Sequence, residues 1–225
     1  MVTIRCKTAG EVWLQSMKLV LEQGVDVSDR NASIEKIEFP QLKEVRNVCF
    51  EIESMDFDDP ILRGYEHYLP KYPPQHPKYD GELRDANDYF VEYYSRNSPP
   101  QGYGRRIYAE YDWLINHLKE KPETKSATIA VPKYNGMAAC ITAIDFKIRN
   151  NNLYMNVVYR SNNAFYKLPA NLLSLGRLQK EIANDLCVEV GSVEWIAFSL
   201  HIYENNCKTA LEILDKNGIA IKVEG

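Results

Sequence analysis

The chain has 225 residues, which is enough to bury a sizeable core, and we expect residues 1–225 to form one domain with one active site. Its composition, 45% apolar and 26% charged with a net charge of −4, is typical of soluble globular proteins and disfavours nucleic acid as a partner. No apolar run approaches the roughly 18 residues of a membrane span, and MVTIRCKTAGEVW does not resemble a signal peptide. We therefore predict a cytoplasmic protein without a membrane partner.

The five cysteines are scattered and odd in number. They form neither CxxC pairs nor zinc spacing with the four histidines, so we expect reduced thiols and no metal site. Any of these thiols is then available for chemistry: Cys6, Cys49, Cys140, Cys187 and Cys207.

The first predicted element is an amphipathic helix over residues 9–23. Trp13, Met17 and Val20 recur at helical spacing, and Gly24 is the usual residue for a left-handed C-terminal cap. The polar stretch that follows leads into an apolar and polar alternation, which indicates a loop feeding a strand. Arg30 lies in that loop.

Residues 47–102 hold most of the prolines and many tyrosines without a sustained period. We predict two short helices there, over 61–69 and 83–94, joined by long loops. The next segment, 106–120, has a clear helical period and ends before Pro122.

A β-hairpin is the most informative prediction. Residues 128–131, 140–148 and 153–160 alternate like strands, and RNNN at 149–152 is a polar turn. A turn centred on Asn150 and Asn151 pairs residues whose numbers sum to about 300, so Cys140 faces Arg160. A helix over 171–186 should cover the sheet, and a strand over 195–203, a short helix and a closing strand should complete the chain.

These positions have chemical and structural interpretations. A thiol beside a fixed positive charge ionises more readily and becomes a nucleophile, although a cysteine in a strand is often a small core residue. Arg160 and Ser161 suit a phosphate or a surface ion pair. Asn171 at a helix start is by default an N-cap. His201 and Tyr203 share a strand face, where they bind ligand hydroxyls or form a half-buried pair.

The segment from Cys140 to Asn206 resembles the thymidylate synthase family. The spacing matches without gaps from Cys140 through YRSNNAF and LPANL to the HxY motif at His201 and Tyr203. A weaker resemblance covers the first helix with VSDRNAS, QGYGRRI and HLKEKPETK, and it fails between about 47 and 101. The resemblance implies an α+β fold with a large mixed sheet covered by helices, and a homodimer packed through a sheet face.

The resemblance also implies roles for individual residues in binding a pyrimidine nucleoside monophosphate. Cys140 would add to carbon 6 of the base, and 5,10-methylenetetrahydrofolate would supply the one-carbon unit. Phosphate ligands would be Arg160, Ser161 and Arg30, together with Lys125 from the neighbouring subunit. Asn171 would contact the base edge, His201 and Tyr203 the sugar hydroxyl, and Tyr103 would be a site tyrosine. Glu66 is the candidate general acid or base, with Glu51 and Glu53 as weaker candidates.

Several positions depart from the family pattern. Cys140 lies between Ala139 and Ile141 rather than within PCH, and Lys125-Ser126 replaces a pair of arginines. Asn163 replaces the aspartate that binds the folate pterin, and Lys167 replaces a glycine. The tryptophan that walls the one-carbon site has no counterpart, since none occurs between Trp13 and Trp113; Tyr89 or Phe90 lies nearest.

These departures favour the hydroxymethylase branch of the family. A methylating enzyme must keep water from the exocyclic methylene, whereas a hydroxymethylase lets water add there. The substrate stays open among CMP, dCMP and dUMP. The alternatives are methylation of dUMP, as in thymidylate synthase, or a nucleotide-binding homologue with altered catalysis.

Overall fold

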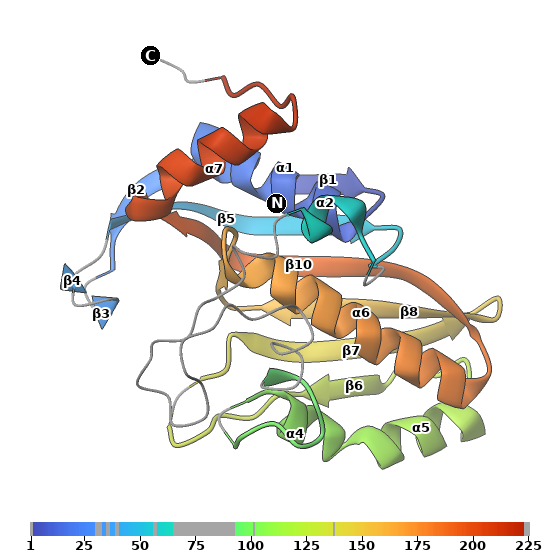
Figure 1. Ribbon diagram of the computed structural model, residues 1–225. Coiled ribbons are helices and arrows are strands. Elements are labelled where there is room, and N and C mark those ends of the chain that lie inside the picture. The colour runs from blue at the N-terminus through green and yellow to red at the C-terminus, as the bar shows by residue number, and fades with distance from the viewer. Residues whose placement is uncertain are drawn as a thin grey trace.

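The computed structural model describes residues 2–29, 33–34, 37–38, 41–55, 58–64, 93–100, 102–136 and 138–222. Among them, eight strands form one mixed sheet (Figure 1). Its order is β1 (Val2–Cys6), β5 (Gln41–Ile52), β10 (Glu189–Tyr203), β8 (Asn152–Tyr159), β7 (Ile141–Arg149) and β6 (Ala127–Ala130), with β2 (Val25–Ser28) paired to β5 and β9 (Asn162–Asn163) to β10. A small hairpin joins β3 (Ser33–Ile34) to β4 (Ile37–Glu38).

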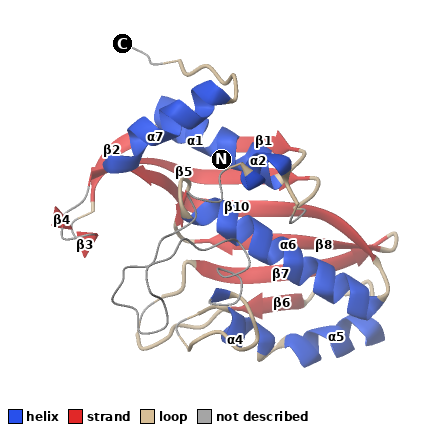
Figure 2. Ribbon diagram, viewed as in Figure 1, coloured by secondary structure: helices blue, strands red, loops and turns tan. Residues whose placement is uncertain are grey.

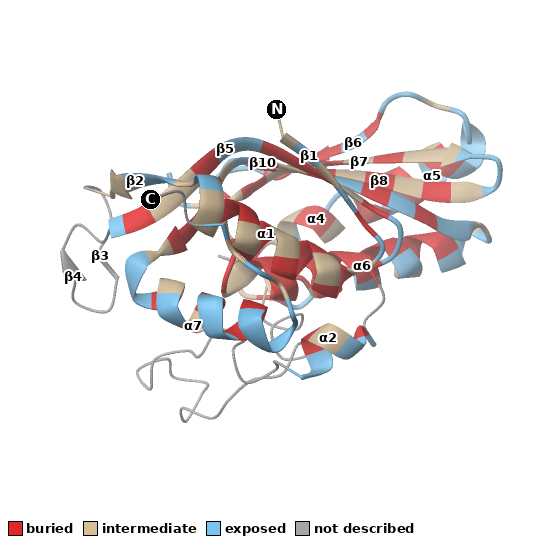
Figure 3. Ribbon diagram, turned by 90° about the horizontal axis from the view of Figure 1, so that it is seen from above, coloured by how far each residue is buried: buried red, intermediate tan, exposed pale blue. Residues whose placement is uncertain are grey.

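The helices complete an α+β architecture (Figure 2). They are α1 (Ala9–Gln23), α2 (Pro60–Arg63), α4 (Gly104–Tyr108), α5 (Tyr111–Glu120), α6 (Lys167–Leu186) and α7 (Glu204–Lys216). Seen edge-on, α1, α6 and α7 lie on one side of the sheet (Figure 3). Strand residues that face them, such as Met155, Val157 and Trp195, are fully buried. The large mixed sheet covered by helices was predicted correctly.

Helix α1 forms as predicted, but its C-terminal cap differs. The Thr8 hydroxyl accepts a hydrogen bond from the Glu11 amide at 3.2 Å, and the apolar stripe packs into the core. Gly24 is not left-handed, since its φ is −69° and its ψ is 134°. A β-carbon there would lie 2.4 Å from the Val20 carbonyl oxygen, so close approach of the backbone requires the glycine.

The β7–β8 hairpin has the predicted register. Ile141 pairs with Tyr159, and Arg149 pairs with Asn152. Asn150 and Asn151 both have positive φ, 51° and 62°, which is the geometry of a two-residue type I′ turn. The hairpin therefore places the residue before β7 beside the residue after β8.

Four other predictions were wrong in part. The helix expected over 106–120 is interrupted at residues 109–110, where Tyr108 and Tyr111 stack and donate to carboxylates of α6. Helix α6 begins at Lys167, four residues early. Strand β5 was missed past residue 47, because Asn47 has a φ of 57° that interrupts the alternation. The described residues after α7, 217–222, form no strand.

The two predicted helices within 47–102 are only partly tested. Helix α2 lies at the start of the predicted 61–69 helix, whereas residues 65–69 lie outside the described residues. The same holds for residues 83–92 of the second predicted helix.

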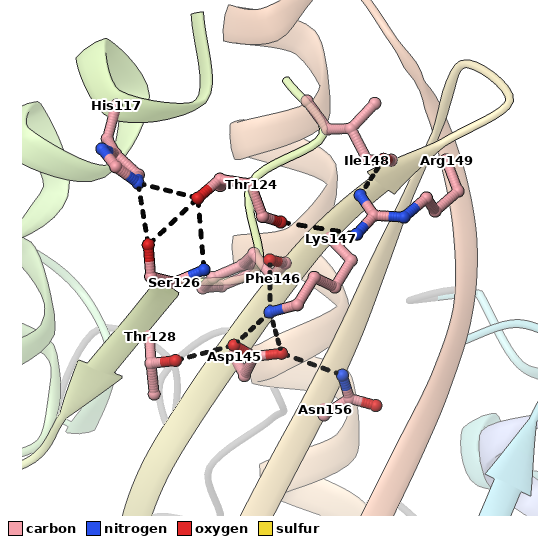
Figure 4. A network of polar contacts seen from close by, with 10 residues as sticks. All are labelled: His117, Thr124, Ser126, Thr128, Asp145, Phe146, Lys147, Ile148, Arg149 and Asn156. Atoms are coloured by element: carbon pink, nitrogen blue, oxygen red, sulfur yellow. Dashed lines mark hydrogen bonds and ion pairs between the residues drawn. The ribbon is translucent and has the colours of Figure 1, made fainter. Parts of the chain in front are cut away.

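The sheet face opposite the helices is partly exposed and carries a polar network (Figure 4). The Asp145 carboxylate accepts hydrogen bonds from Thr128 at 2.7 Å and from Asn156 at 3.2 Å, and it pairs with Lys147 at 2.6 Å. Phe198 on β10 is 51% exposed. Side chains from four strands thus present a mixed polar and apolar surface.

Candidate functional site

The hairpin brings Cys140 and Arg160 together, as predicted. Cys140 directly precedes β7, and Arg160 directly follows β8. The Arg160 amide donates to the Cys140 carbonyl at 2.8 Å, and Arg160 Nη2 lies 3.8 Å from Cys140 Sγ. Cys140 is partly exposed.

The Arg160 guanidinium is anchored to the segment that carries the thiol. Its Nε donates to the Ala139 carbonyl at 3.0 Å and its Nη2 to the Ala138 carbonyl at 3.1 Å. The residue stays exposed at the surface. An exposed guanidinium with a fixed orientation is suited to bind an anionic group.

Three tyrosines that precede α4 form a cluster, and two of them, Tyr94 and Tyr103, interact electrostatically with Cys140. The Tyr103 ring lies 5.3 Å from the Tyr94 ring and 6.2 Å from the Tyr93 ring, centroid to centroid. Burial raises the pKa of Tyr103, and the Cys140 side chain, to which Tyr103 is hydrogen-bonded, raises that pKa further. Burial also raises the pKa of Tyr93 and of Tyr94. These phenols therefore remain protonated donors at neutral pH.

Asn171 lies at the inner end of a buried hydrogen-bond chain. Its side-chain oxygen accepts a 2.9 Å hydrogen bond from the Tyr94 hydroxyl, which lies 2.6 Å from the Tyr159 hydroxyl. Asn171 is 3% exposed and lies within α6, so the N-cap interpretation was wrong. The Tyr159 ring stacks on Trp195 at 4.7 Å, which fixes the far end of the chain.

His201 and Tyr203 lie together near the end of β10, with ring centroids 5.2 Å apart. Burial lowers the pKa of His201 even though Glu44 and Asp29 act in the opposite direction. Burial raises the pKa of Tyr203, and Asp29 and Cys140 add to that effect. The pair is therefore neutral at pH 7, and Tyr203 interacts electrostatically with the thiol.

Asn163 has a clear structural role. Its side-chain oxygen accepts hydrogen bonds from the Phe165 amide at 3.0 Å and the Tyr166 amide at 2.9 Å, which turns the chain into α6. Ser161 lies half-buried between Arg160 and β9. Residues 160–163 thus connect the phosphate-binding candidates to the helix that carries Asn171.

Lys167, the first residue of α6, also reaches the thiol region. Its ammonium nitrogen lies 5.4 Å from the centroid of the Tyr93 ring. Burial lowers the pKa of Lys167 to about 8, against an opposing effect of Cys140. The sequence had shown Lys167 only as a departure from a family glycine, and Tyr93 and Tyr94 were not singled out. Their one sequence signal was the density of tyrosines before Gly104.

For three predicted residues the structure gives no position at the thiol, two of them because they are not described. Arg30 and Glu66 lie outside the described residues. Lys125 is exposed just before β6, whose first residue pairs with Phe146 of β7. Six residues of strand at about 3.3 Å each separate that level from Cys140, or about 20 Å. The weaker carboxylate candidate Glu51 forms an ion pair with Arg5 of β1.

Within the part of the chain that the structure describes, no group of three or more His, Cys, Asp or Glu side chains could hold a metal ion. No helix among these residues has the length and hydropathy to cross a membrane.

Comparisons with known proteins give one consistent result. A family model described as thymidylate synthase matches residues 78–221. Two similar relatives carry the name "Putative thymidylate synthase". The one from Methanothermobacter thermautotrophicus is 30% identical over 94% of this chain and 98% of its own length, and the one from Methanothermobacter marburgensis is 27% identical over 92% and 95%. A thymidylate synthase from Buchnera aphidicola is 24% identical over 59% of this chain and 58% of its own.

Proposed function

Because the chain belongs to the thymidylate synthase family and is a one-carbon transferase, we propose that it adds a hydroxymethyl group to carbon 5 of a pyrimidine nucleoside monophosphate. The co-substrate of the family is 5,10-methylenetetrahydrofolate. The candidate nucleotides are CMP, dCMP and dUMP.

In the proposed reaction Cys140 adds to carbon 6 of the base, which makes carbon 5 nucleophilic toward the one-carbon unit. Arg160 and Ser161 bind the phosphate, with Arg30 as a further ligand. The neutral Tyr103 hydroxyl donates a hydrogen bond to the Cys140 sulfur and so restricts movement of the sulfur away from the base.

The remaining roles concern recognition of the nucleotide. Asn171 contacts the base edge, and the Tyr94 hydroxyl restrains the orientation of its amide. His201 and Tyr203 bind the sugar hydroxyl, and Asn163 shapes the loop at the pterin position. Glu66 is retained as the general acid or base on the resemblance alone.

The polar surroundings of Cys140 are the observation that favours hydroxymethylation over methylation. Tyr94, Tyr103 and Lys167 interact electrostatically with Cys140, and the Tyr93 ring lies beside that of Tyr103. The tryptophans lie elsewhere: Trp13 and Trp195 are buried in the core, and Trp113 is exposed on α5. Hydrogen-bonding groups hold water near the reacting carbon, whereas methylation requires its exclusion.

The test is to incubate the protein with 5,10-methylenetetrahydrofolate and, separately, CMP, dCMP, UMP and dUMP, and to measure the masses of the nucleotide products. We expect one nucleotide to gain a hydroxymethyl group. A methyl gain on dUMP would instead establish the alternative, a thymidylate synthase reaction. No product in any reaction would favour a nucleotide-binding homologue.

The covalent mechanism predicts the phenotype of Cys140→Ala. Turnover should fall below detection, because no other group can make the bond to carbon 6, while the Kd for the nucleotide should change by less than about threefold, since the thiol supplies no phosphate contact. Cys187→Ala, at an exposed cysteine after α6, is the matched control. Activity of Cys140→Ala close to wild type would eliminate the covalent mechanism.

We further propose a homodimer that packs through the sheet face opposite the helices. That face carries the Asp145 network (Figure 4). It also carries Phe198, which is exposed. Ala127, two residues after Lys125, pairs with Phe146, about 20 Å along β7 from Cys140, so we assign Lys125 to the site of a second copy rather than to the site of its own chain. The dimer thus gives Lys125 a phosphate to bind.

A further inference from the structure

The amine of Lys167 is a reactive group that the proposed roles leave unused. It begins α6 and lies 5.4 Å from the centre of the Tyr93 ring, which in turn lies 6.2 Å from the Tyr103 ring. Tyr103 is hydrogen-bonded to the Cys140 side chain, and Lys167 itself interacts electrostatically with Cys140. The amine therefore lies close enough to the thiol to interact with a group bound there.

We propose that Lys167 is a catalytic residue that binds the attacking water and accepts its proton when the hydroxymethyl group forms. This inference rests on the proposed function, since it assigns the proton acceptor for the addition of water and leaves to Glu66 the proton transfers at the pyrimidine oxygen.

The step balances in atoms and electrons. Before it, the base carries the Cys140 sulfur on carbon 6 and an exocyclic methylene on carbon 5. The water oxygen bonds to the methylene carbon, a water proton moves to the neutral Lys167 amine, and the electron pair of the exocyclic bond moves toward the carbon 4 substituent. That pair then returns to form the bond between carbons 5 and 6 as the carbon–sulfur bond breaks, which releases the Cys140 thiolate. No oxidant or reductant is required.

Among the described residues, the other groups around the thiol are poor proton acceptors. Burial raises the pKa values of Tyr93, Tyr94 and Tyr103, so these phenols keep their protons. The guanidinium of Arg160 has only N–H donors and no acceptor atom. Cys140 itself is bonded to the base at this stage.

The remaining neighbours do not compete with the amine. Tyr203 also has a raised pKa and keeps its proton. The neutral imidazole of His201 is 7% exposed beside it on β10, and the proposed function already uses it to bind the sugar hydroxyl. The Lys167 amine, by contrast, has a pKa of about 8 because of burial, so a substantial fraction is neutral near pH 8. General-base assistance of this kind contributes about 10²–10⁴-fold in rate.

The test compares wild type with Lys167→Met and Lys167→Arg on the nucleotide that wild type converts, labelled with tritium at carbon 5. Tritium release in the first turnover reports transfer of the one-carbon unit, and product mass reports addition of water. Both variants should release tritium at a rate within about threefold of wild type but form hydroxymethyl product at least about 100-fold more slowly. Lys180→Met, at an exposed lysine of α6, should behave as wild type.

Two further measurements separate catalysis from folding. With 2-mercaptoethanol present, Lys167→Met should yield mainly the thioether of the exocyclic methylene, because a thiolate needs no base. The wild-type rate of hydroxymethyl formation should rise with pH through about 8, as the amine loses its proton, and this rise should be absent from Lys167→Met.

The outcomes are decisive. Hydroxymethyl formation by Lys167→Met at the wild-type rate would overturn the inference, as would loss of tritium release together with product. Retention of the wild-type rate by Lys167→Arg alone would also overturn it, because arginine keeps the charge but accepts no proton. A methyl product from wild type would remove the proposed function and, with it, this role.

Discussion

At the scale of single residues, Arg160 has two roles: it is a candidate phosphate ligand, and it holds the segment that carries Cys140. Its guanidinium fixes the carbonyls of Ala138 and Ala139, and it faces the sulfur of Cys140. Binding of a phosphate and placement of the thiol are thereby coupled through one side chain. A substitution at this position should affect both.

We predict that Arg160→Ala weakens nucleotide binding by about 10- to 100-fold, since a charge-assisted contact contributes about 1.5–3 kcal/mol. Arg160→Lys should recover little, because an ammonium cannot reproduce the forked donor geometry. Isothermal titration with the nucleotide provides the Kd, and Arg177→Ala, an exposed arginine on α6, is the control. Equal affinities in Arg160→Ala and wild type would exclude Arg160 from the phosphate site.

The proximity of Cys140 and Arg160 could be predicted because it follows from local pairing arithmetic across a two-residue turn. The environment of Asn171 could not. Its partner Tyr94 lies 77 residues earlier in the chain, within a stretch that has no clear period. The local sequence pattern cannot reveal a contact between residues so far apart in the chain. Asn171 was therefore interpreted by default as an N-cap, and that interpretation was wrong.

At the scale of elements, α6 controls the site, since it carries both Lys167 and Asn171. Its approach to the preceding chain is unusually close at Gly176, where a β-carbon would lie 2.2 Å from the Met55 carbonyl oxygen. A backbone oxygen cannot move aside as the end of a flexible side chain can. A β-carbon at position 176 therefore requires either α6 or the chain at Met55 to shift.

Gly176→Ala should therefore destabilise the protein by about 1–3 kcal/mol, although alanine is the better helix former. Urea unfolding measures this free energy. Gly64→Ala is the matched control, because its nearest contact would be an ordinary 3.5 Å. A variant at position 176 that is as stable as wild type would show that the close approach is easily relaxed.

Element prediction succeeded where periodicity was unbroken and failed where the backbone departs from it. Helix α1 and the β7–β8 hairpin were predicted well. The left-handed conformation of Asn47 breaks the alternation, so β5 was not predicted there, although Val48, Phe50 and Ile52 after it alternate toward the core. The start of α6 was missed because Asn163 caps the turn through its side chain, which hydropathy does not register.

At the scale of the whole molecule, the position of Lys125 predicts shared active sites. Cys140→Ala and Lys125→Glu should each be inactive or nearly so as homodimers. After the two are mixed, unfolded and refolded together, a heterodimer has one site with both lesions and one with neither, so about a quarter of wild-type activity should return. A mixture that remains as inactive as its components would contradict sharing of sites, and sedimentation of each variant checks that dimers formed.

The fold class followed from the resemblance and was confirmed, whereas the sheet order was not predicted. Strands β1 and β5 pair in parallel, and β10 lies between β5 and β8. These contacts join the two ends of the chain. No short-range pattern specifies them, because many alternative orders would bury the same apolar residues.

The β7–β8 hairpin, which joins Cys140 to Arg160, also affects the order in which the protein folds. Only 20 residues separate Cys140 from Arg160, whereas β5 and β10 pair across more than half of the chain. Hairpins close within microseconds, and pairings between distant segments form later. A nascent chain should therefore bring thiol and guanidinium together before β10 and the tyrosines enclose them. During that interval the Cys140 sulfur is exposed to solvent and oxidants, because the residues that later surround it have not yet folded. The yield of active protein should therefore depend more on reducing conditions during synthesis than on reducing conditions after folding.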